Sequence, residues 1–348
     1  MQTRTSPIPD SLGLKAGDYV RVRSVEEILS TLDDEGCLAG LPFMPEMLQH
    51  CGSRLRVHKV AHKTCDTVNG AGGRSMRDAV HLEDLRCDGS AHGGCEAGCT
   101  LFWKESWLQR DGENAPPARV AEAGRTDEAV CSVETLHRSC QRLDSDPADP
   151  TYRCQTTDLL RATDLLEASK MGQYVRDVTS GNHSAWHVAK LLMRAAYEGI
   201  VGLAPGYRLW VGIFNAVQRL IGGKPWPEVN PTIPDGSPTP TATLDLKPGE
   251  RVRVRPIREI EQTLTKKGFN RGMRFDLEMI KYCDGEYTVK SRVNKIINEK
   301  SGRMMNMKYP CILLDDVYCR AVCTPGRRGC PRAVNTYWRE IWLKRVDG

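Results

Sequence analysis

The residues most able to do chemistry are concentrated between Cys87 and Cys99. This stretch carries three cysteines and one histidine: Cys87, His92, Cys95 and Cys99. Structural zinc takes four cysteine or histidine ligands, and the chain must fold back on itself to aim them at one point. Glycines that permit such turns lie between the ligands, at Gly89, Gly93, Gly94 and Gly98. The stretch therefore predicts a metal site.

The fourth ligand of this site has two candidates, Cys65 in the segment HKTCDT and His92. The Cys-x7-Cys-x3-Cys spacing differs from the common CxxC zinc knuckle, so the competing interpretation is a set of buried thiols that bind nothing. We expect the metal to be Zn²⁺, with iron or an iron-sulfur cluster as the alternative.

The cysteine-rich stretch has a counterpart near the C-terminus. Residues 246–283 match residues 14–51 without a gap, at numbers that differ by 232, and Cys87 falls on Cys319 in the same register. Beyond Cys87 the numbers of matched residues differ by 235, three more than before. The matched pairs beyond the shift are Cys95 with Cys330, Trp103 with Trp338 and Trp107 with Trp342. Two copies are too few for a solenoid, so we predict a duplicated domain of roughly 100 residues.

A second, poorer metal site is predicted in the second copy. Ile297 falls where Cys65 would be, so the fourth ligand must come from elsewhere. Cys311 lies on a predicted strand, on the order of 26 Å from Cys319 in an extended chain, and is expected in the core. The predicted ligands are Cys283, Cys319, Cys323 and Cys330.

Short strands must position these loops. Residues 19–23 alternate, with Val20 and Val22 on one face, and Ser24 is the expected N-cap of a helix over 25–32, with Glu27 completing a capping box. Other strands are predicted at 54–60 and 79–85, with counterparts at 287–293 and 311–317. Residues 102–108, and their counterpart 337–343, are expected to form a strand or a short helix. The V-R-V-R opening resembles the first strand of small SH3-like barrels. The predicted fold class is α+β, with two repeated SH3-like β domains, each bearing a cysteine-rich loop, flanking a helical insert.

The middle of the chain is predicted to be helical, unlike the two copies on either side of it. Helical spacing appears over residues 130–143, 157–168, 172–178, 185–203 and 207–221. The predicted organisation is a flexible leader (1–13), a first metal-binding repeat (14–112), a helical insert (113–229), a Pro/Thr linker (230–245) and a second repeat (246–348).

The insert has metal-ligand candidates of its own. Glu134 and His137 form an ExxH pair on one helix face, the spacing of carboxylate-bridged di-iron sites, and His183 and His187 are four residues apart. Solvated histidines are the favoured interpretation, because too few carboxylates accompany them. Cys131, Cys140 and Cys154 fit either a further cluster or helix packing. No nucleophile-elbow, zinc-protease, phosphate-loop or dinucleotide motif is found, and a lone Cys65 nucleophile near His58 and His62 is the weakest candidate.

Composition limits the function classes. A net charge of +5 spread over 348 residues gives no specific nucleic-acid signal. The fourteen cysteines are clustered and no signal-peptide segment is visible, so we expect a cytoplasmic protein whose thiols bind metal. No transmembrane segment is expected. Residues 203–220 place Trp210, Phe214 and Leu220 on one apolar face, and we favour their packing against the barrels over peripheral membrane contact.

Several phrases of the chain resemble a family of uncharacterised bacterial proteins associated with biosynthetic gene clusters. They are TLDDEGCLAGLPFMPEM, DLRCDGSAHGGCEAGCTLFWKESWL, YRCQTTDLL and CPRAVNTYWREIWLKRV. The resemblance implies a bacterial, cytoplasmic setting and no catalytic residue. Our hypothesis is a zinc-stabilised tandem-repeat accessory protein that binds a protein or peptide partner. The alternative is a metal-dependent tailoring enzyme of a biosynthetic pathway, using iron or an iron-sulfur cluster.

Overall fold

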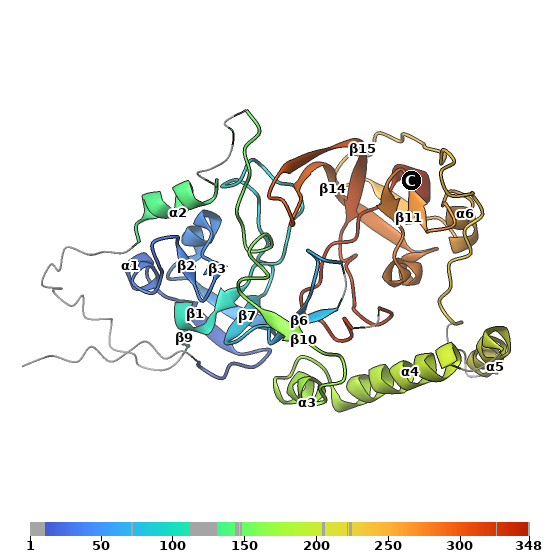
Figure 1. Cartoon of the computed structure of the whole chain (residues 1–348), viewed down its shortest axis with the longest axis horizontal. Helices are drawn as coiled ribbons and strands as arrows, with labels where there is room; N and C mark the ends of the chain where they lie inside the picture. Colours follow the sequence, from blue (N-terminus) through green and yellow to red (C-terminus); the bar gives the residue numbers. More distant parts are fainter. Residues whose placement is uncertain are drawn as a thin grey trace, which may run out of the picture. The chain divides into compact units, whose positions relative to one another are not determined.

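The structure is a computed structural model that describes residues 11–70, 72–111, 131–142, 146, 148–203, 206–220, 222, 225–324 and 326–346 (Figure 1). Helices and strands are mixed, which confirms the predicted α+β class. Apart from residues 11–13, the predicted leader lies outside the described residues, as does the start of the predicted insert at 113–130.

Two compact units divide the chain, and their boundaries cross the predicted domains. Unit 1 comprises Met1–Ser184, Lys295–Asn306 and Cys330–Arg332, and unit 2 comprises Ala185–Asn294, Met307–Gly329 and Ala333–Gly348. The predicted insert 113–229 is therefore shared between the units. Unit 1 also includes a segment, Lys295–Asn306, from the predicted second repeat.

A five-stranded antiparallel sheet organises unit 1, in the order β8-β7-β4-β1-β9. Its strands are β1 (Tyr19–Val22), β4 (Arg54–Val60), β7 (Ala79–Leu82), β8 (Trp103–Lys104) and β9 (Leu108–Arg110). Val20 and Val22 are buried while Tyr19 and Arg21 are exposed, as the alternation predicts.

Helix α1 (Val25–Leu29) begins as predicted but ends earlier. The backbone N–H of Glu27 donates to the Ser24 hydroxyl, and the Glu27 carboxylate accepts from the Ser24 N–H, which completes the capping box. The prediction extended the helix to Leu32. Instead, the hydroxyls of Ser30 and Thr31 donate to carbonyl groups three residues back, both at 2.7 Å. Side-chain bonds of this kind compete with the helical ladder, so the chain turns away.

The core of unit 1 is centred on Trp103, Trp107 and Phe43, all fully buried. The Phe43 and Trp107 rings meet edge to face, with centroids 5.0 Å apart. The indole N–H of Trp107 donates to the Thr31 hydroxyl at 3.2 Å, which satisfies the polar atom that burial would otherwise leave unpaired.

Residues 157–168, predicted to be helical, form one helix-like turn followed by a strand. Backbone N–H groups of Asp158 and Ala162 donate four residues back, and β10 (Asp164–Leu166) then pairs with β6 (Gly73–Ser75), which also pairs with β5 (Lys63–Cys65). The helical prediction was wrong here because the free edge of β6 offers backbone partners that the local pattern does not reveal.

The remaining elements of unit 1 are short. They are β2 (Cys37–Leu38), β3 (Leu41–Pro42), the 3₁₀ helices η1 (Pro45–His50) and η2 (Glu105–Trp107), and the helices α2 (Val133–Ser139) and α3 (Gly172–Thr179).

Unit 2 contains most of a four-stranded sheet in the order β15-β14-β11-β16, of which residues 295–297 and 304–306 belong to unit 1. Its strands are β11 (Arg251–Val254), β14 (Glu286–Ile297), β15 (Met304–Leu314) and β16 (Leu343–Arg345). The other elements are α4 (Ala185–Leu203), α5 (Tyr207–Leu220), α6 (Ile257–Glu261), β12 (Phe269–Asn270), β13 (Met273–Arg274), η3 (Leu277–Tyr282) and η4 (Glu340–Trp342). None of the helices in the described residues is long and apolar enough to cross a membrane.

Matched residues make similar contacts in the second core. Phe275 meets Trp342 edge to face at 5.3 Å, and the Trp342 indole N–H donates to the Thr263 hydroxyl at 2.8 Å. These are the positions that the sequence match pairs with Phe43, Trp107 and Thr31. That both sheets close as repeated SH3-like barrels stays a prediction.

Candidate metal centre

Glu46, Cys87 and His92 bring three potential metal ligands together in unit 1. One ligand atom from each lies within 4.8 Å of the others, and within the described ranges no other group of three or more such side chains does so. The Nε2 atom of His92 is 3.3 Å from the Cys87 sulfur, and its Nδ1 atom is 3.9 Å from Oε1 of Glu46. The donor set thus combines sulfur, nitrogen and oxygen.

Glu46 reaches the site from the start of η1. Pro45 occupies the first turn of this 3₁₀ helix, where its missing N–H would be unpaired in any case. Phe43 and Met44 before it and Met47 after it are buried in the core, so the helix is held firmly by its apolar neighbours. The Glu46 side chain is consequently buried as well.

Cys87 and His92 come from one tight loop. The N–H of Cys87 donates to the Cys99 carbonyl at 2.8 Å, which closes the base of the loop. Inside it, the Gly89 carbonyl accepts the N–H groups of His92 at 3.2 Å and Gly94 at 2.9 Å. Gly89 has a φ of +73°, and a Cβ atom there would lie 2.0 Å from the Cys95 carbonyl oxygen. Glycine is therefore required for the loop to present its ligands.

Burial disfavours the charged form of all three groups. It raises the pKa of Glu46 and of the Cys87 thiol, and it lowers the pKa of His92 to about 4. Both carboxylate oxygens of Glu46 and Nδ1 of His92 are buried without a hydrogen-bond partner among the described residues. A neutral imidazole is the metal-binding form, and a bound cation would favour the thiolate and the carboxylate. The site is thus built from groups that a cation would satisfy.

Cys87 and His92 line a small cavity of about 30 Å³, which has room for a single water-sized group. Three further cysteine thiols line it too. They belong to Cys95, Cys99 and Cys154. The backbone N–H of Ile297 donates to the Cys95 sulfur at 3.4 Å. Burial raises the pKa of Cys99 to about 12. Cys87 and His92 therefore share a cavity wall with three further thiols, whereas Glu46 does not line it.

Cys154 lies on a turn whose donors point at its sulfur. The Thr156 hydroxyl is 3.1 Å from the Cys154 sulfur, and the backbone N–H groups of Thr156 and Thr157 also bond to it. These bonds favour the thiolate, although burial outweighs them and the pKa of Cys154 is raised. Hydrogen bonds of this type orient and tune cysteine ligands in metal sites.

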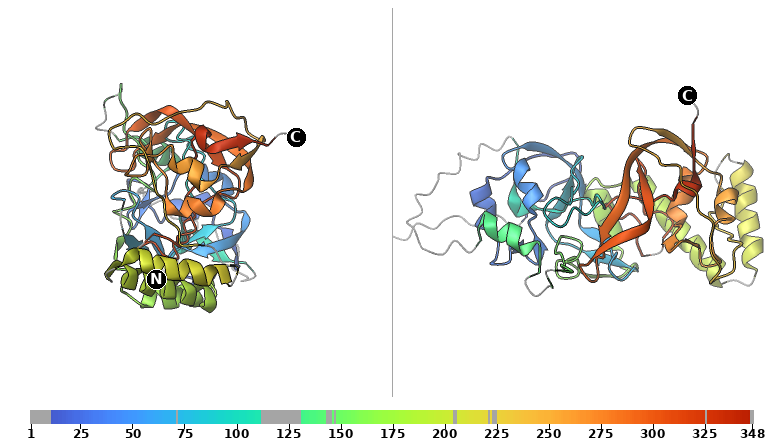
Figure 2. Two further views of the ribbon diagram at one scale, coloured as in Figure 1. Left: turned by 90° about the vertical axis from the view of Figure 1, so that its right-hand side faces the viewer. Right: turned by 90° about the horizontal axis from the view of Figure 1, so that it is seen from above.

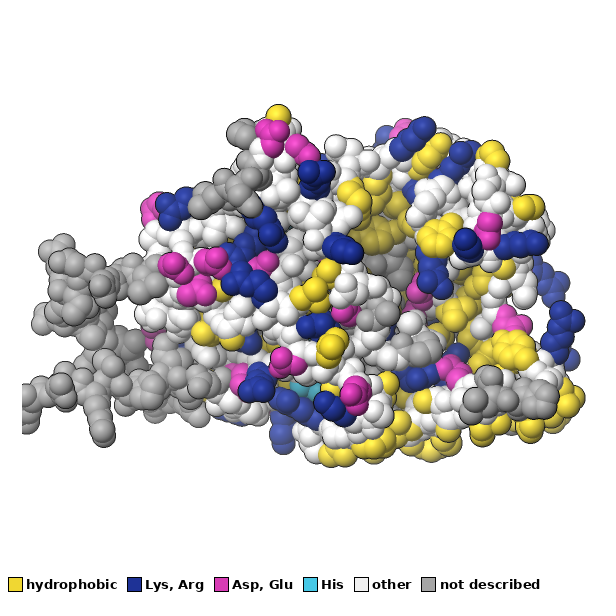
Figure 3. Space-filling model, viewed as in Figure 1, with side chains coloured by type: hydrophobic (Ala, Val, Ile, Leu, Met, Phe, Trp, Pro, Cys, Tyr) yellow, Lys and Arg dark blue, Asp and Glu magenta, His cyan; other side chains and the backbone are white. Residues whose placement is uncertain are grey.

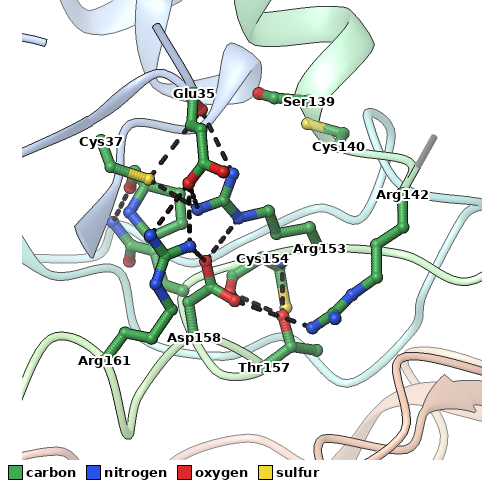
Figure 4. Close-up of polar contacts among 12 residues, drawn as sticks. Glu35, Cys37, Ser139, Cys140, Arg142, Arg153, Cys154, Thr157, Asp158 and Arg161 are labelled. Carbon is green, nitrogen blue, oxygen red and sulfur yellow. Dashed lines mark hydrogen bonds and ion pairs between the residues drawn. The ribbon is translucent and has the colours of Figure 1, made fainter. Parts of the chain in front are cut away.

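Charged side chains hold the Cys154 turn in place (Figure 4). The Arg153 guanidinium bonds to Asp158 and, at 2.9 Å, to Glu35, while Arg161 also bonds to Glu35 at 2.9 Å. Arg142 lies 3.9 Å from Asp158. The same side chains line a second cavity of about 610 Å³. Because each of these arginines faces a carboxylate, we interpret the network as a scaffold for the turn.

The sequence analysis missed Glu46 as a candidate ligand and left the role of Cys154 undecided. A signal for Glu46 was present, because it matches Glu278 in the second copy, and an acid retained at matched positions beside core residues indicates a specific role. Cys154 could have been indicated by the pattern Cys-x-Thr-Thr, because hydroxyl and amide groups that follow a cysteine this closely can donate to its sulfur.

The other predicted ligands of the first site are distributed differently. His92, Cys87, Cys95 and Cys99 share the cavity, whereas Cys65 lies on β5 and does not line it. That the four residues bind one metal ion stays a prediction. Cys65 and Cys99 instead interact electrostatically with Arg332, a fully buried guanidinium that is 3.8 Å from Glu299. Whether Cys65 is a ligand stays a prediction.

The predicted second site does not fall within one unit. Cys283, Cys319 and Cys323 belong to unit 2, and Cys330 belongs to unit 1. Of the candidates in the insert, Glu134 and His137 are exposed on α2, which agrees with solvated side chains, and Cys131 and Cys140 are buried in the core of unit 1. His183 lies in unit 1 and His187 in unit 2.

No protein-family model matches the chain, and no curated protein is significantly similar to it. The resemblance to a bacterial family therefore stays a prediction, and any function must be argued from the chain's own residues.

Proposed function

We propose that this chain is a metal-binding accessory protein whose first unit is stabilised by a Zn²⁺ ion at Glu46, Cys87 and His92. The observation that carries the proposal is the set of buried atoms without partners, Oε1 and Oε2 of Glu46 and Nδ1 of His92, beside the Cys87 thiol. Leaving such atoms unpaired costs on the order of 1–3 kcal/mol each. A cation offsets this cost, and sulfur, nitrogen and carboxylate oxygen are all ligands that Zn²⁺ accepts.

None of the cavity thiols, Cys95, Cys99 and Cys154, has its sulfur within the 4.8 Å group, so we propose that one of them moves toward the ion to supply the fourth donor. The loop from Cys87 to Cys99 and the turn at Cys154 are far apart in sequence, so an ion that binds both would cross-link unit 1. The metal's binding free energy then contributes directly to folding.

Several features favour a structural ion over a catalytic one. Glu46 and His92 are buried, and the cavity of about 30 Å³ has no room for an organic substrate. A rigid, metal-stabilised unit is suited to presenting a preformed surface, and preorganisation lowers the entropic cost of binding. Binding of a protein or peptide partner therefore remains our proposal for the biological role.

The rival function is a metal-dependent enzyme. The observation in its favour is that three protein ligands of mixed type, with an open fourth position, are typical of catalytic zinc. In that case, water or substrate would complete the coordination, and the thiols would remain outside it.

Metal analysis of the protein purified without added metal tests the proposal. We expect about one zinc ion per chain in unit 1, lost together with folding when a chelator is added. Substitution by Co²⁺ should give the sulfur-to-metal charge-transfer absorbance of a thiolate ligand and the intense visible bands of a four-coordinate ion. Cys87→Ser should lose the ion, and Cys131→Ser, a buried cysteine outside the cavity, is the control. Iron with visible absorbance would contradict the zinc proposal.

A further inference from the structure

The helices α4 and α5 of unit 2 expose an unusual amount of apolar surface. Trp186 on α4 is 64% exposed, and on α5 Leu209 is 65% and Leu220 is 87% exposed. Isolated exposed apolar residues are common, but a contiguous patch marks an interaction surface. The other exposed apolar residues of the two helices are Met193, Ile200, Tyr207, Ile213 and Val217.

On α5 these residues form one stripe. Leu209, Ile213, Val217 and Leu220 follow each other at intervals of four, four and three residues, so they share a helix face. On the opposite face Val211 is buried, and Phe214, on the side between the two faces, contacts Tyr197 and Trp226 at ring-centroid distances of 5.4 and 5.1 Å. Trp210 and Phe214, which the sequence analysis grouped with Leu220, are half-buried, whereas Leu220 is exposed.

On α4 the exposed stripe repeats at every second turn. Trp186, Met193 and Ile200 are seven residues apart, while Val188 and Leu191 are buried on the other side. The Tyr197 hydroxyl donates to the Trp210 carbonyl at 2.6 Å and ties the two helices together. The helix axes are steeply inclined to each other: α5 is seen end-on in Figure 1 and lengthwise in the views of Figure 2. In Figure 3, hydrophobic side chains gather along the lower edge, where α4 runs.

The exposed charged side chains of α4 and α5 are all basic. Lys190, Arg208 and Arg219 are exposed. The one acidic residue of the two helices, Glu198, is 19% exposed at its side chain and is paired with Arg194 at 2.9 Å and with Arg328. Arg208 and Arg219 are three helical turns apart and therefore flank the stripe on the same side. The surface presents apolar and basic side chains without an exposed acid on either helix.

We infer that the surface formed by α4 and α5 binds an anionic lipid bilayer, with both helices lying in the interface. The combination of an apolar stripe containing tryptophan with flanking Lys and Arg is what such a surface attracts, by burial of the stripe and by attraction of the bases. A second copy of the chain fits less well. A two-fold contact would press this surface against a second copy of itself, so basic side chains would face basic side chains with no exposed acid on either helix to offset the repulsion.

Sedimentation of the full chain with vesicles tests the inference. We expect binding to phosphatidylcholine vesicles that contain phosphatidylserine, weak binding to phosphatidylcholine alone, and release at high salt. Leu209→Ser with Leu220→Ser should weaken binding by at least about tenfold, because two exposed leucines no longer enter the interface. Arg208→Glu with Arg219→Glu should weaken it about 30-fold or more.

Leu165→Ser is the matched control. Leu165 is 74% exposed on β10 in unit 1, so its replacement removes a similar apolar side chain elsewhere and should leave vesicle binding unchanged. Because the substituted leucines and arginines are exposed, the variants should fold normally. The inference is overturned if the wild-type chain does not sediment with anionic vesicles, or if both double variants bind as well as the wild type. A dimer in sedimentation velocity that the leucine double variant converts to a monomer, together with no vesicle binding, would instead indicate that a second copy covers this surface.

Discussion

Glu46 and Glu278 occupy matched places in the two units but meet opposite surroundings. Each is the second residue of a 3₁₀ helix, each is buried, and burial raises the pKa of both. The Glu278 carboxylate accepts the backbone N–H groups of Cys323 and, at 3.2 Å, Thr324. The Glu46 carboxylate has no hydrogen-bond partner among the described residues and faces His92 and Cys87 instead.

The loops that follow explain the difference. His92 is five residues after Cys87, and Thr324 is five residues after Cys319. In unit 2 the loop presents backbone amides, so the buried acid is satisfied by the protein alone. In unit 1 the loop presents an imidazole and a thiol, and we propose that a cation satisfies the acid there. The comparison teaches that the surroundings of a buried carboxylate depend on what the neighbouring loop presents: backbone amides in unit 2, and side chains able to bind a metal in unit 1.

Loss of a ligand should have the largest effect. We expect Cys87→Ser to lower the free energy of unfolding of unit 1 by more than about 4 kcal/mol, because the metal's contribution to folding is lost. Chemical denaturation monitored by circular dichroism, with metal content measured in parallel, checks this. Cys319→Ser is the matched change in unit 2. If it is equally costly and also releases metal, unit 2 holds an ion as well and the contrast between the units disappears.

Lowering the pH should reduce the stability of unit 1 more than that of unit 2. His81 is fully buried, its Nδ1–H donates to the Leu101 carbonyl at 2.9 Å, and burial lowers its pKa to about 3 from an ordinary value of 6.5. Between these values the unfolded chain binds a proton that the folded chain does not. Stability is therefore complete above pH 6.5 and is lost as the pH falls toward 3, with a loss of about 3 kcal/mol reached at pH 4.

The matched residue in unit 2 is Leu313, which has no such proton to bind. His81→Leu should therefore reduce the acid dependence of unit 1, measured as the change in urea midpoint between pH 7 and pH 4. Burial lowers the pKa of His50, His58 and His92 too, so part of the dependence should remain. An unchanged pH dependence in the variant would contradict this assignment.

A Cβ atom at Gly89 should disrupt the metal loop. Gly89→Ala is expected to cost about 3 kcal/mol and to weaken metal binding, because the methyl group would meet the Cys95 backbone. The matched residue, Ala321, already has a φ of +53° in unit 2, and Ala321→Gly should stabilise that unit by at most about 1 kcal/mol. Thermal unfolding checks both. Gly94→Ala is the control, since its Cβ would meet only the end of the Lys295 side chain, although its φ of +69° adds some strain.

Replacing Glu46 or Glu278 by glutamine distinguishes the roles of the two side chains with the smallest change in their shape. Glu46→Gln should lower zinc affinity at least about tenfold, because a charged ligand becomes a neutral amide. Glu278→Gln should leave metal content unchanged and cost about 1 kcal/mol, since an amide oxygen still accepts the two N–H groups but without the charge. Competition with a zinc chelator measures the first effect, and denaturation measures the second. Equal effects of the two changes on zinc affinity would mean that Glu46 is not a ligand.

Local patterns in the sequence determined much of the framework. The alternation at Tyr19–Val22, the strand Arg54–Val60 and the capping box of Ser24 and Glu27 all appear in the structure as predicted. The cluster of Cys87, His92, Cys95 and Cys99 was also found from spacing, and these residues do line one cavity. Each of these features depends on residues close together in the chain, so a local pattern is sufficient to reveal it.

Only the tertiary structure decided which distant residues complete the site. Glu46 joins Cys87 because η1 is held in the core by Met44 and Met47, and Cys154 joins the cavity because its turn is fixed by Arg153. In the same way, residues 164–166 became a strand because β6 had a free edge. Contacts between residues far apart in sequence depend on how whole elements pack, and periodicity and caps carry no information about that.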